Sequence, residues 1–332
     1  EKLKSLGVEP RTRVLMERIV RDGDGRVKGV QVREGYKFPD RSSGKVKFIA
    51  ARRAVVLAHG GFGADVKFRS IQDPKLTDKL GTTCQPGATS ETWREAARIG
   101  CHMIQTDWIQ CVPWTAPSEK GMGIALFFAQ GAAAMFGVWV EDRNGSRFVD
   151  ELANRKVRAD AIFAEEAKGL KAIAIANQYG ADKLEAARPG IMKKLVEPNI
   201  VSKYDTLEAL ADHFGIKKDA FLEEVKKFNG FVKAGEDKDF GRILSFNNGL
   251  TVSQGPFYGI ECCPKIHHTM GGVMINEKAE VISATTQKPI KGLYAGGEVT
   301  GGVHGASRLG TVAVIDALTF GMIAGENFAA MK

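Results

Sequence analysis

At 332 residues, 44% of them hydrophobic and 26% charged, the chain has the composition of a folded globular protein and enough length for two domains. Its net charge of +8 is spread along the sequence, and no base-reading or RNA-binding motif accompanies it, so we expect no nucleic-acid partner. The five cysteines have neither haem-attachment nor metal-ligand spacing, so no metal site and no disulfide framework are predicted.

Short strands are predicted at the start of the chain. Apolar alternation around the Asp-Gly-rich turn at residues 22–25 predicts a hairpin, and two more strands follow: the four are Arg13–Val20, Arg26–Arg33, Val46–Ile49 and Ala54–Leu57. The fourth runs into His59-Gly60-Gly61, as a buried parallel strand runs into a tight turn. We expect His59 to be a packing residue rather than a catalyst.

The middle of the chain is predicted to be mostly helical. A helix is expected at residues 92–99, with Ser90 or Thr89 as its N-cap. Strand signals are weak between about residue 108 and residue 266, where helices are expected over Ala159–Gly169, Asp205–Phe214 and Lys218–Ala234. The longest uncharged stretch, Gly121–Val140, holds four glycines and a glutamine, and its flanks carry no basic cluster. A buried wall is therefore predicted there, and no membrane span.

The last quarter of the chain carries the clearest chemical signal. His267-His268-Thr269-Met270-Gly271-Gly272 precedes the run Gly292–Gly310, in which seven of nineteen residues are glycine. An apolar strand opens this run, and an apolar helical pattern, Thr311–Ala329, follows it. Strand, glycine turn and helix N-terminus in this order predict a cofactor cradle, because bare backbone lets N–H groups reach a phosphate-bearing ligand.

These motifs resemble the C-terminal part of the FAD-dependent fumarate reductase/succinate dehydrogenase flavoproteins, especially the soluble flavocytochrome c fumarate reductases and urocanate reductases. The resemblance is most specific from His267 to Ala329 and good at Ala54–Gly63 and Gly145–Arg155. It implies an α/β FAD-binding domain of the glutathione-reductase-like type, formed by residues 1–107 and 268–332, with an inserted, mostly helical clamp domain at residues 108–267. The G-x-G-x-x-G unit that binds the FAD pyrophosphate in such proteins is not found, so we expect these residues to be a C-terminal portion.

The resemblance also implies a non-covalent FAD. The residues expected to contact it are Gly60, Gly61, Glu91, His268, Gly297, Glu298, Arg308, Ala313 and Val314. Two positions depart from the family pattern: Glu91 replaces an aspartate between glycines, and Thr311-Val312 replaces a common Gly-Asn. Without the pyrophosphate unit, the isolated chain is expected to bind FAD poorly.

Reduction of an α,β-unsaturated carboxylate needs a hydride for the β-carbon, cations that hold the carboxylate, and an acid that protonates the α-carbon. The segment Gly145–Arg155 matches the family's GxRFVNExxxR, with Asp150 in place of the asparagine. The resemblance therefore assigns proton donation to Arg155 and carboxylate binding to His267 and Arg308. Arginine suits these tasks because its planar fork binds a carboxylate through two hydrogen bonds.

The binding site that the family uses for a second carboxylate is missing. Val112 stands at the position of a family histidine, and Gly121–Val140, where an acid and a proton-relay arginine are expected, contains no charged residue. The expected substrate pocket is instead apolar and aromatic, lined by Val112, Trp114, Met122, Phe127 and Phe128. Burying a second carboxylate there would cost several kcal/mol, whereas an apolar group would gain about 25 cal/mol per Å². We therefore expect an unsaturated monocarboxylate with an apolar or aromatic end.

Two other functions stay open at this level. A flavin-dependent ketosteroid or enone dehydrogenase or reductase would share the fold and the apolar wall, although the three carboxylate-binding residues argue against it. A non-catalytic flavin electron carrier is the other. As partners we expect a small unsaturated acid and an external electron donor, such as a cytochrome or another redox protein. The resemblance favours a periplasmic or other extracytoplasmic location, with the cytoplasm also possible.

Overall fold

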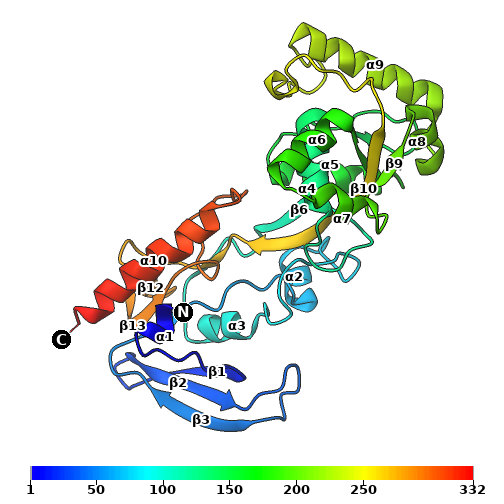
Figure 1. Cartoon of the computed structure of the whole chain (residues 1–332). Helices are drawn as coiled ribbons and strands as arrows, with labels where there is room; N and C mark the ends of the chain where they lie inside the picture. The colour runs from blue at the N-terminus through cyan, green and yellow to red at the C-terminus, as the bar shows by residue number, and fades with distance from the viewer. Residues whose placement is uncertain (1, 332) are drawn as a thin grey trace. The chain divides into compact units, whose positions relative to one another are not determined.

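The structure, a computed structural model, describes residues 2–331, and these residues form two compact units (Figure 1). Unit 1 contains the chain up to Thr77, Gln85–Ile109 and the residues from His268 onward, whereas unit 2 contains Asp78–Cys84 and Gln110–His267. The sequence places Asp78–Cys84 in the flavin-binding part instead. The segment joins unit 2 through backbone hydrogen bonds on both sides of Ile266, from Thr83 N to Ile266 O (2.8 Å) and from Ile266 N to Gly81 O (3.0 Å).

The first sheet of unit 1 is a three-stranded antiparallel meander. Its strands are β1 (Val14–Arg21), β2 (Val27–Glu34) and β3 (Lys45–Ala50), as predicted within one or two residues. Asp22 closes the first turn by accepting hydrogen bonds from the backbone of Asp24 and Arg26. Helix α3 (Glu91–Arg98) is fixed to β1 by Glu95, which accepts a 2.7 Å hydrogen bond from the backbone of Ile19.

The second sheet of unit 1 joins segments from the two ends of the chain. Its order is β12 (Glu280–Ile282), β13 (Pro289–Ala295) and β4 (Val55–Leu57), and β13 runs parallel to β4 with Leu293 opposite Val55. Two segments far apart in the sequence are thus neighbouring strands of one sheet. A short pair, β5 (Met103–Ile104) with β11 (Gly272–Val273), and the helices α1 (Lys2–Ser5) and α2 (Val66–Gln72) complete this part of the unit.

Helix α10 (Val312–Ala329) packs against β13 in unit 1 but leaves much of its apolar surface exposed (Figure 1). Gly296 allows the close approach, because a side chain there would lie 3.1 Å from the backbone of Phe320. Val314, Ile315, Leu318 and Met322 are exposed. By length and composition alone, α10 is the one helix among residues 2–331 that could cross a membrane, and such a single helix is weak evidence for a span.

Unit 2 is built around a mostly antiparallel sheet that the sequence did not predict, although helices make up most of its regular secondary structure, as expected. The order is β6 (Ile109–Thr115), β10 (Phe257–Thr269), β8 (Ala172–Asn177) and β7 (Val138–Glu141), with β9 (Ser202–Tyr204) also paired to β10. The strands were missed because they are covered on both faces. All six residues of β8 are buried, so its sequence shows no polar alternation.

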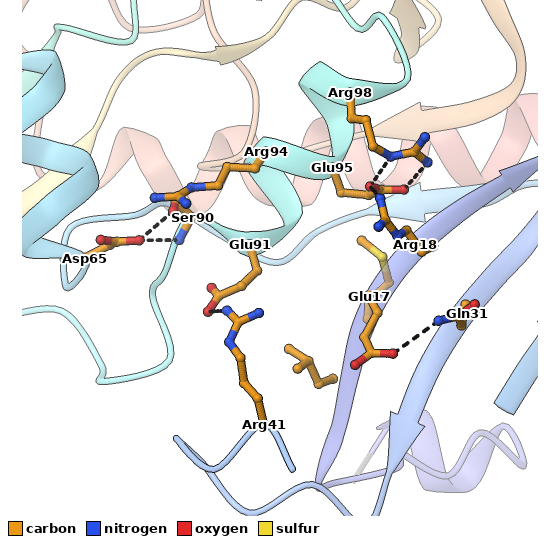
Figure 2. A pocket seen from close by; sticks show the side chains of 12 residues that line it. Glu17, Arg18, Gln31, Arg41, Asp65, Ser90, Glu91, Arg94, Glu95 and Arg98 are labelled. Carbon is orange, nitrogen blue, oxygen red and sulfur yellow. Dashed lines mark hydrogen bonds and ion pairs between the residues drawn. The ribbon is translucent and has the colours of Figure 1, made fainter. Parts of the chain in front are cut away.

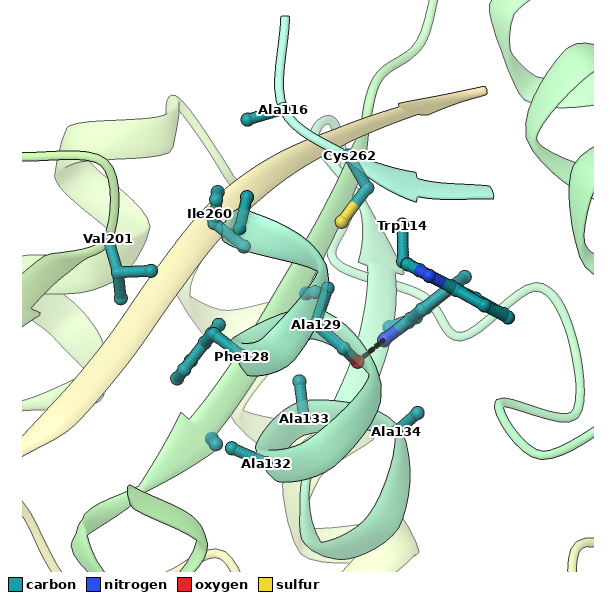
Figure 3. Close-up of a cluster of buried hydrophobic side chains, with 14 of the residues drawn as sticks. Trp114, Ala116, Phe128, Ala129, Ala132, Ala133, Ala134, Val201, Ile260 and Cys262 are labelled. Atoms are coloured by element: carbon teal, nitrogen blue, oxygen red, sulfur yellow. Dashed lines mark hydrogen bonds between the residues drawn. The ribbon is translucent and has the colours of Figure 1, made fainter. Parts of the chain in front are cut away.

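Helices cover this sheet and form two hydrophobic clusters with it. Figure 3 shows one of them, the cluster that contains Trp114 and Phe128. The helical elements are α4 (Ala125–Phe128), a π-helix (Ala129–Ala134), α5 (Arg155–Glu166), α6 (Gln178–Ala187), α7 (Ile191–Val196), α8 (Leu207–Phe214), α9 (Lys218–Ala234) and a 3-10 turn (Ser245–Asn247). The uncharged stretch Gly121–Val140 supplies α4, the π-helix and part of β7. It forms the predicted buried wall, with Phe128 and Ala132 fully buried.

Candidate active site

Glycine-containing segments of unit 1 lie close together, and several of their glycines serve contacts within the protein. A side chain at Gly61 would come within 2.2 Å of Thr269 Oγ1 and 2.4 Å of Glu298 Oε1. In the same way, a side chain at Gly272 would lie 2.1 Å from the carbonyl oxygen of Val299. Close backbone packing therefore explains part of the glycine pattern that the sequence assigned to cofactor binding.

Two predicted cofactor residues, His268 and Glu298, contact each other in unit 1. His268 Nδ1 lies 3.5 Å from Glu298 Oε2, and the backbone N–H of Thr269 donates to Glu298 Oε1 at 3.0 Å. Burial by itself would raise the pKa of Glu298, but the contacts with His268 and Thr269 outweigh it and lower that pKa. Glu298 is therefore a carboxylate at neutral pH, and it fixes the orientation of the buried His268 ring.

His304 and Asp316, which the sequence did not single out, extend this group. The His304 ring centroid lies 5.5 Å from that of His268, and His304 Nε2 lies 3.2 Å from Asp316 Oδ2. Burial raises the pKa of Asp316 and lowers that of His304. His304 stands within the glycine-rich run, so its position in the sequence could have identified it as a candidate site residue. Asp316 lies twelve residues further on in α10, and no sequence pattern links the two.

Arg308 and the start of α10 form the other end of this region. Arg308 is buried, and its Nη1 donates a 2.9 Å hydrogen bond to the backbone oxygen of Gly310. Burial lowers the pKa of Arg308, whereas the negative charge of Glu298 partly raises that pKa again. The helix begins at Val312, one residue after the start of the helical pattern predicted from the sequence. Thr311 makes no side-chain hydrogen bond to the first turn, whose N–H groups can therefore serve a ligand oxygen.

The remaining predicted residues of this region lie on either side of that helix start. Gly297 is buried and has φ = 78°, which places the left-handed turn after β13. Ala313 is half-buried and Val314 is exposed, both in the first turn of α10. Their contact with FAD remains a prediction.

The turn after β4 fits a flat polar cofactor such as FAD. Gly60 has φ = 82°, and no protein atom lies within 4 Å of where its side chain would stand. Beside it, both ring nitrogens of His59 are buried without a hydrogen-bond partner among the described residues, and burial lowers the pKa of His59 to about 4. Ligands of α/β folds bind at the carboxyl ends of strands, where this turn lies. His59 and Gly60 are thus suited to contact the cofactor, which differs from the packing role expected for His59.

Glu91 lies in a polar pocket of unit 1 with a volume of about 610 Å³ (Figure 2). Its carboxylate is paired with Arg41, and the neighbouring Glu95 binds Arg98 and Arg18. Four arginines and four carboxylates line the pocket, so its charges compensate one another: they are Arg18, Arg41, Arg94, Arg98, Glu17, Asp65, Glu91 and Glu95. The predicted contact of Glu91 with FAD remains a prediction.

In unit 2, the loop before α5 places Arg155 at the N-terminus of that helix. Asn154 caps the helix by accepting a 3.1 Å hydrogen bond from Val157 N. The loop itself is held by fully buried ion pairs: Arg147 binds Glu151 through two hydrogen bonds of 2.8 Å and also Asp237. Arg147 and Glu151 belong to the predicted motif, whereas Asp237 lies outside it, and together these ion pairs fix the backbone that carries Arg155.

His267 lies near the end of β10, and its partner in unit 2 is Thr83. His267 Nδ1 lies 2.7 Å from Thr83 Oγ1. If the hydroxyl donates to Nδ1, the ring proton sits on Nε2, the nitrogen that could donate to a carboxylate. Sequence reasoning missed Thr83, which is distant along the chain and belongs to no recognised motif.

The five predicted pocket residues of unit 2 divide into two groups. Val112, Trp114 and Phe128 are buried in the hydrophobic cluster, whereas Met122 and Phe127 are only partly buried against it. Figure 3 shows Trp114 and Phe128 in this cluster. The Trp114 ring lies under two guanidinium groups, those of Arg155 (5.2 Å to the ring centroid) and Arg158 (4.2 Å). Of the five, only Met122 and Phe127 keep appreciable surface for a ligand.

Comparison with known proteins gives the family of the chain. Residues 1–314 match the family model described as FAD binding domain. The chain belongs to this family of FAD-binding flavoproteins. The prediction of FAD as cofactor and of a mixed α/β flavoprotein fold is thereby confirmed.

Individual flavoproteins of this kind are similar over nearly the whole chain. The acrylate reductase flavoprotein subunit of Shewanella woodyi is 37% identical over 98% of the chain and 63% of its own length. The solved open conformation of a flavocytochrome c3 fumarate reductase has a TM-score of 0.73 and 32% identity, over 99% of the chain and 54% of that protein. A 3-ketosteroid Δ1-dehydrogenase from Sterolibacterium denitrificans has a TM-score of 0.76 at 24% identity, covering 99% and 61%, which shows a shared fold alone. The chain thus spans a little over half the length of these proteins.

Proposed function

We propose that the flavoprotein reduces the C=C bond of a small α,β-unsaturated monocarboxylate with an apolar end, taking electrons from an external redox protein. The observation that carries this proposal is the chemistry of unit 2. The segment Gly121–Val140 folds into a buried apolar wall without a charged side chain, beside an arginine-bearing helix start. Similarity to an acrylate reductase supports the proposal, because acrylate is an unsaturated monocarboxylate.

Each of three residues has a distinct proposed task. When bound, FAD supplies the hydride for the β-carbon. Arg308 and His267 hold the substrate carboxylate, and Arg155 donates a proton from its guanidinium to the α-carbon. Burial lowers the pKa of Arg308, and a carboxylate bound against it would restore the favourable charge pairing.

Specificity for an apolar end is proposed to come from Met122 and Phe127. Both are partly buried against the cluster, so each can contact a methyl or phenyl substituent without unfolding the core. A second carboxylate at this wall would lose its hydration without a cation from residues 121–140, at a cost of several kcal/mol. The ketosteroid dehydrogenase shares only the fold, and no contact in the described residues favours an enone.

The test is a substrate comparison with the complete, flavin-loaded enzyme. Oxidation of reduced viologen dye is followed with acrylate, methacrylate, cinnamate, fumarate and a steroid enone, in the wild type and in Arg155→Gln. We expect the monocarboxylates to react far faster than fumarate or the enone. Arg155→Gln should abolish turnover, a loss of at least about 10²-fold, while the flavin content is unchanged.

Lys156→Gln is the matched control, because Lys156 is the next residue of α5 and its ion pair with Asp160 is exposed. This variant should keep the wild-type rate. An enzyme that prefers fumarate would contradict the proposed substrate class, and an Arg155→Gln enzyme with an unchanged rate would contradict the proposed proton donor.

A further inference from the structure

Arg158 is a buried arginine with no carboxylate ion pair in the part of the chain that the structure describes. Only 4% of the residue is exposed, and its Nη1 donates to Gln130 Oε1 (2.7 Å) and to the backbone oxygen of Glu151 (2.8 Å). Its Nε has no hydrogen-bond partner. The other two buried arginines of this region, Arg147 and Arg242, instead bind the carboxylate of Glu151 directly. Burying a cation without a carboxylate partner costs free energy of folding, so the presence of an arginine at this buried position calls for a reason.

Arg158 is placed beside the proposed proton donor. It follows Arg155 by three residues in the first turn of α5, so the two side chains project from the same side of the helix. Both guanidinium groups lie over the Trp114 ring, at 5.2 Å for Arg155 and 4.2 Å for Arg158. Trp114 thus contacts both guanidinium groups, and the charge of Arg155 is near enough to lower the pKa of Arg158.

The partner that orients Arg158 is neutral. Gln130 belongs to the π-helix Ala129–Ala134, an uncommon conformation that occurs often at functional sites. Its amide oxygen accepts from Arg158 without adding a negative charge. Burial, together with the charge of Arg155, lowers the pKa of Arg158 to about 9, and the charges of Asp150, Glu151 and Cys262 only partly oppose this. Arg158 can therefore lose a proton far more readily than an ordinary arginine.

We propose that Arg158 returns a proton to Arg155 in each turnover, an assignment that rests on the proposed role of Arg155. When an N–H bond of Arg155 breaks and the proton forms the new C–H bond of the product, Arg155 becomes a neutral guanidine. An N–H proton of Arg158 then moves to Arg155, directly or through one water molecule. Neutral Arg158 regains a proton from solvent, so each turnover transfers one solvent proton to the product.

The experiment compares Arg158→Gln and Arg158→Lys with the wild type in the flavin-loaded enzyme. In the wild type, kcat should fall as pH rises through about 9, because Arg158 loses its proton there. Arg158→Gln should lower kcat by roughly 10²-fold and abolish this fall in kcat at alkaline pH. Arg158→Lys should restore part of kcat and change the pH at which kcat falls. KM should change little in both variants, because Arg158 is not proposed to contact the substrate.

A second measurement is independent of turnover. The ¹³Cζ resonance of Arg158, assigned by its loss in Arg158→Lys, is followed against pH in the wild-type protein. Titration near pH 9 supports the proposal, and a charge retained above about pH 12, the ordinary range for arginine, overturns it. If the wild type reduces no unsaturated acid, the proposed function fails, while the resonance still reports on Arg158. If turnover is normal and Arg158→Gln keeps the wild-type kcat and pH profile, only the role of Arg158 fails.

Discussion

Glu151→Gln should destabilise unit 2 strongly, because it removes the negative charge at the centre of a fully buried ion network. The Glu151 carboxylate accepts two 2.8 Å hydrogen bonds from Arg147, one of 3.2 Å from Arg242 and one from the backbone of Trp139. All the ion-paired side chains of this network are completely buried. Without the Glu151 charge, buried Arg147 would keep only Asp237 and buried Arg242 would keep no carboxylate partner among the described residues, at a cost of about 3–5 kcal/mol.

The change is measured by urea denaturation at pH 7, with buried Trp139 contributing to the fluorescence signal. For a unit of this size the expected loss corresponds to a fall in Tm of roughly 6–20 °C. Glu223→Gln is the matched control, because its ion pair with Lys226 is 72–76% exposed and is worth about 0–1 kcal/mol. A Glu151→Gln protein that loses less than about 1 kcal/mol would refute the reasoning that the buried charge holds this network together.

The same network predicts a dependence on pH. Burial alone would raise the pKa of Glu151, but Arg242 and Arg147 outweigh it, so the folded-state pKa lies below the 4.5 of an unperturbed glutamate. The stabilisation is therefore complete above pH 4.5 and is lost as pH falls through the lower, folded-state pKa. Glu151→Gln should lack this part of the acid sensitivity.

Two further predictions concern unit 1. Gly61→Ala should cost about 1–3 kcal/mol in urea denaturation, because the added methyl group would lie 2.2 Å from Thr269 Oγ1. Gly87→Ala, with no atom within 4 Å of the new methyl group, should be close to neutral, and equal losses in the two variants would contradict the packing argument. His59 has a folded-state pKa of about 4, below the 6.5 of its unperturbed ring, so the unfolded chain binds more protons between these values. Stability should thus fall by about 3 kcal/mol from pH 7 to pH 4 in the wild type but by less in His59→Asn, and parallel losses would disprove the assignment.

The sequence predicted those elements whose side chains alternate or whose ends carry turn residues. The strands of the meander were located within one or two residues, and α9 (Lys218–Ala234) was predicted with its observed ends. β8 was missed because both of its faces are buried, which removes the alternation on which such predictions depend. The π-helix could not be anticipated either, since alanine and glycine there are compatible with several buried conformations.

Residues of the candidate site could be predicted from the sequence only if they stand in a recognisable motif. His267, Arg155 and Arg308 stand in recognisable motifs, whereas Arg158 has the sequence context of an ordinary surface charge three residues into a helix. Only its burial over Trp114 distinguishes it. Contacts between distant residues depend on the fold itself and leave no local pattern.

The two adjacent histidines of β10 show that neighbouring residues of a strand can have entirely different surroundings. Successive side chains of a strand point to opposite faces, so His267 meets Thr83 in unit 2 while His268 meets Glu298 in unit 1. The pair therefore offers no redundancy, because neither imidazole can replace the other after a substitution. Deletion of one residue from β10 before the two histidines would exchange the sheet faces to which they point. Both imidazoles would still be present, but neither would reach its partner.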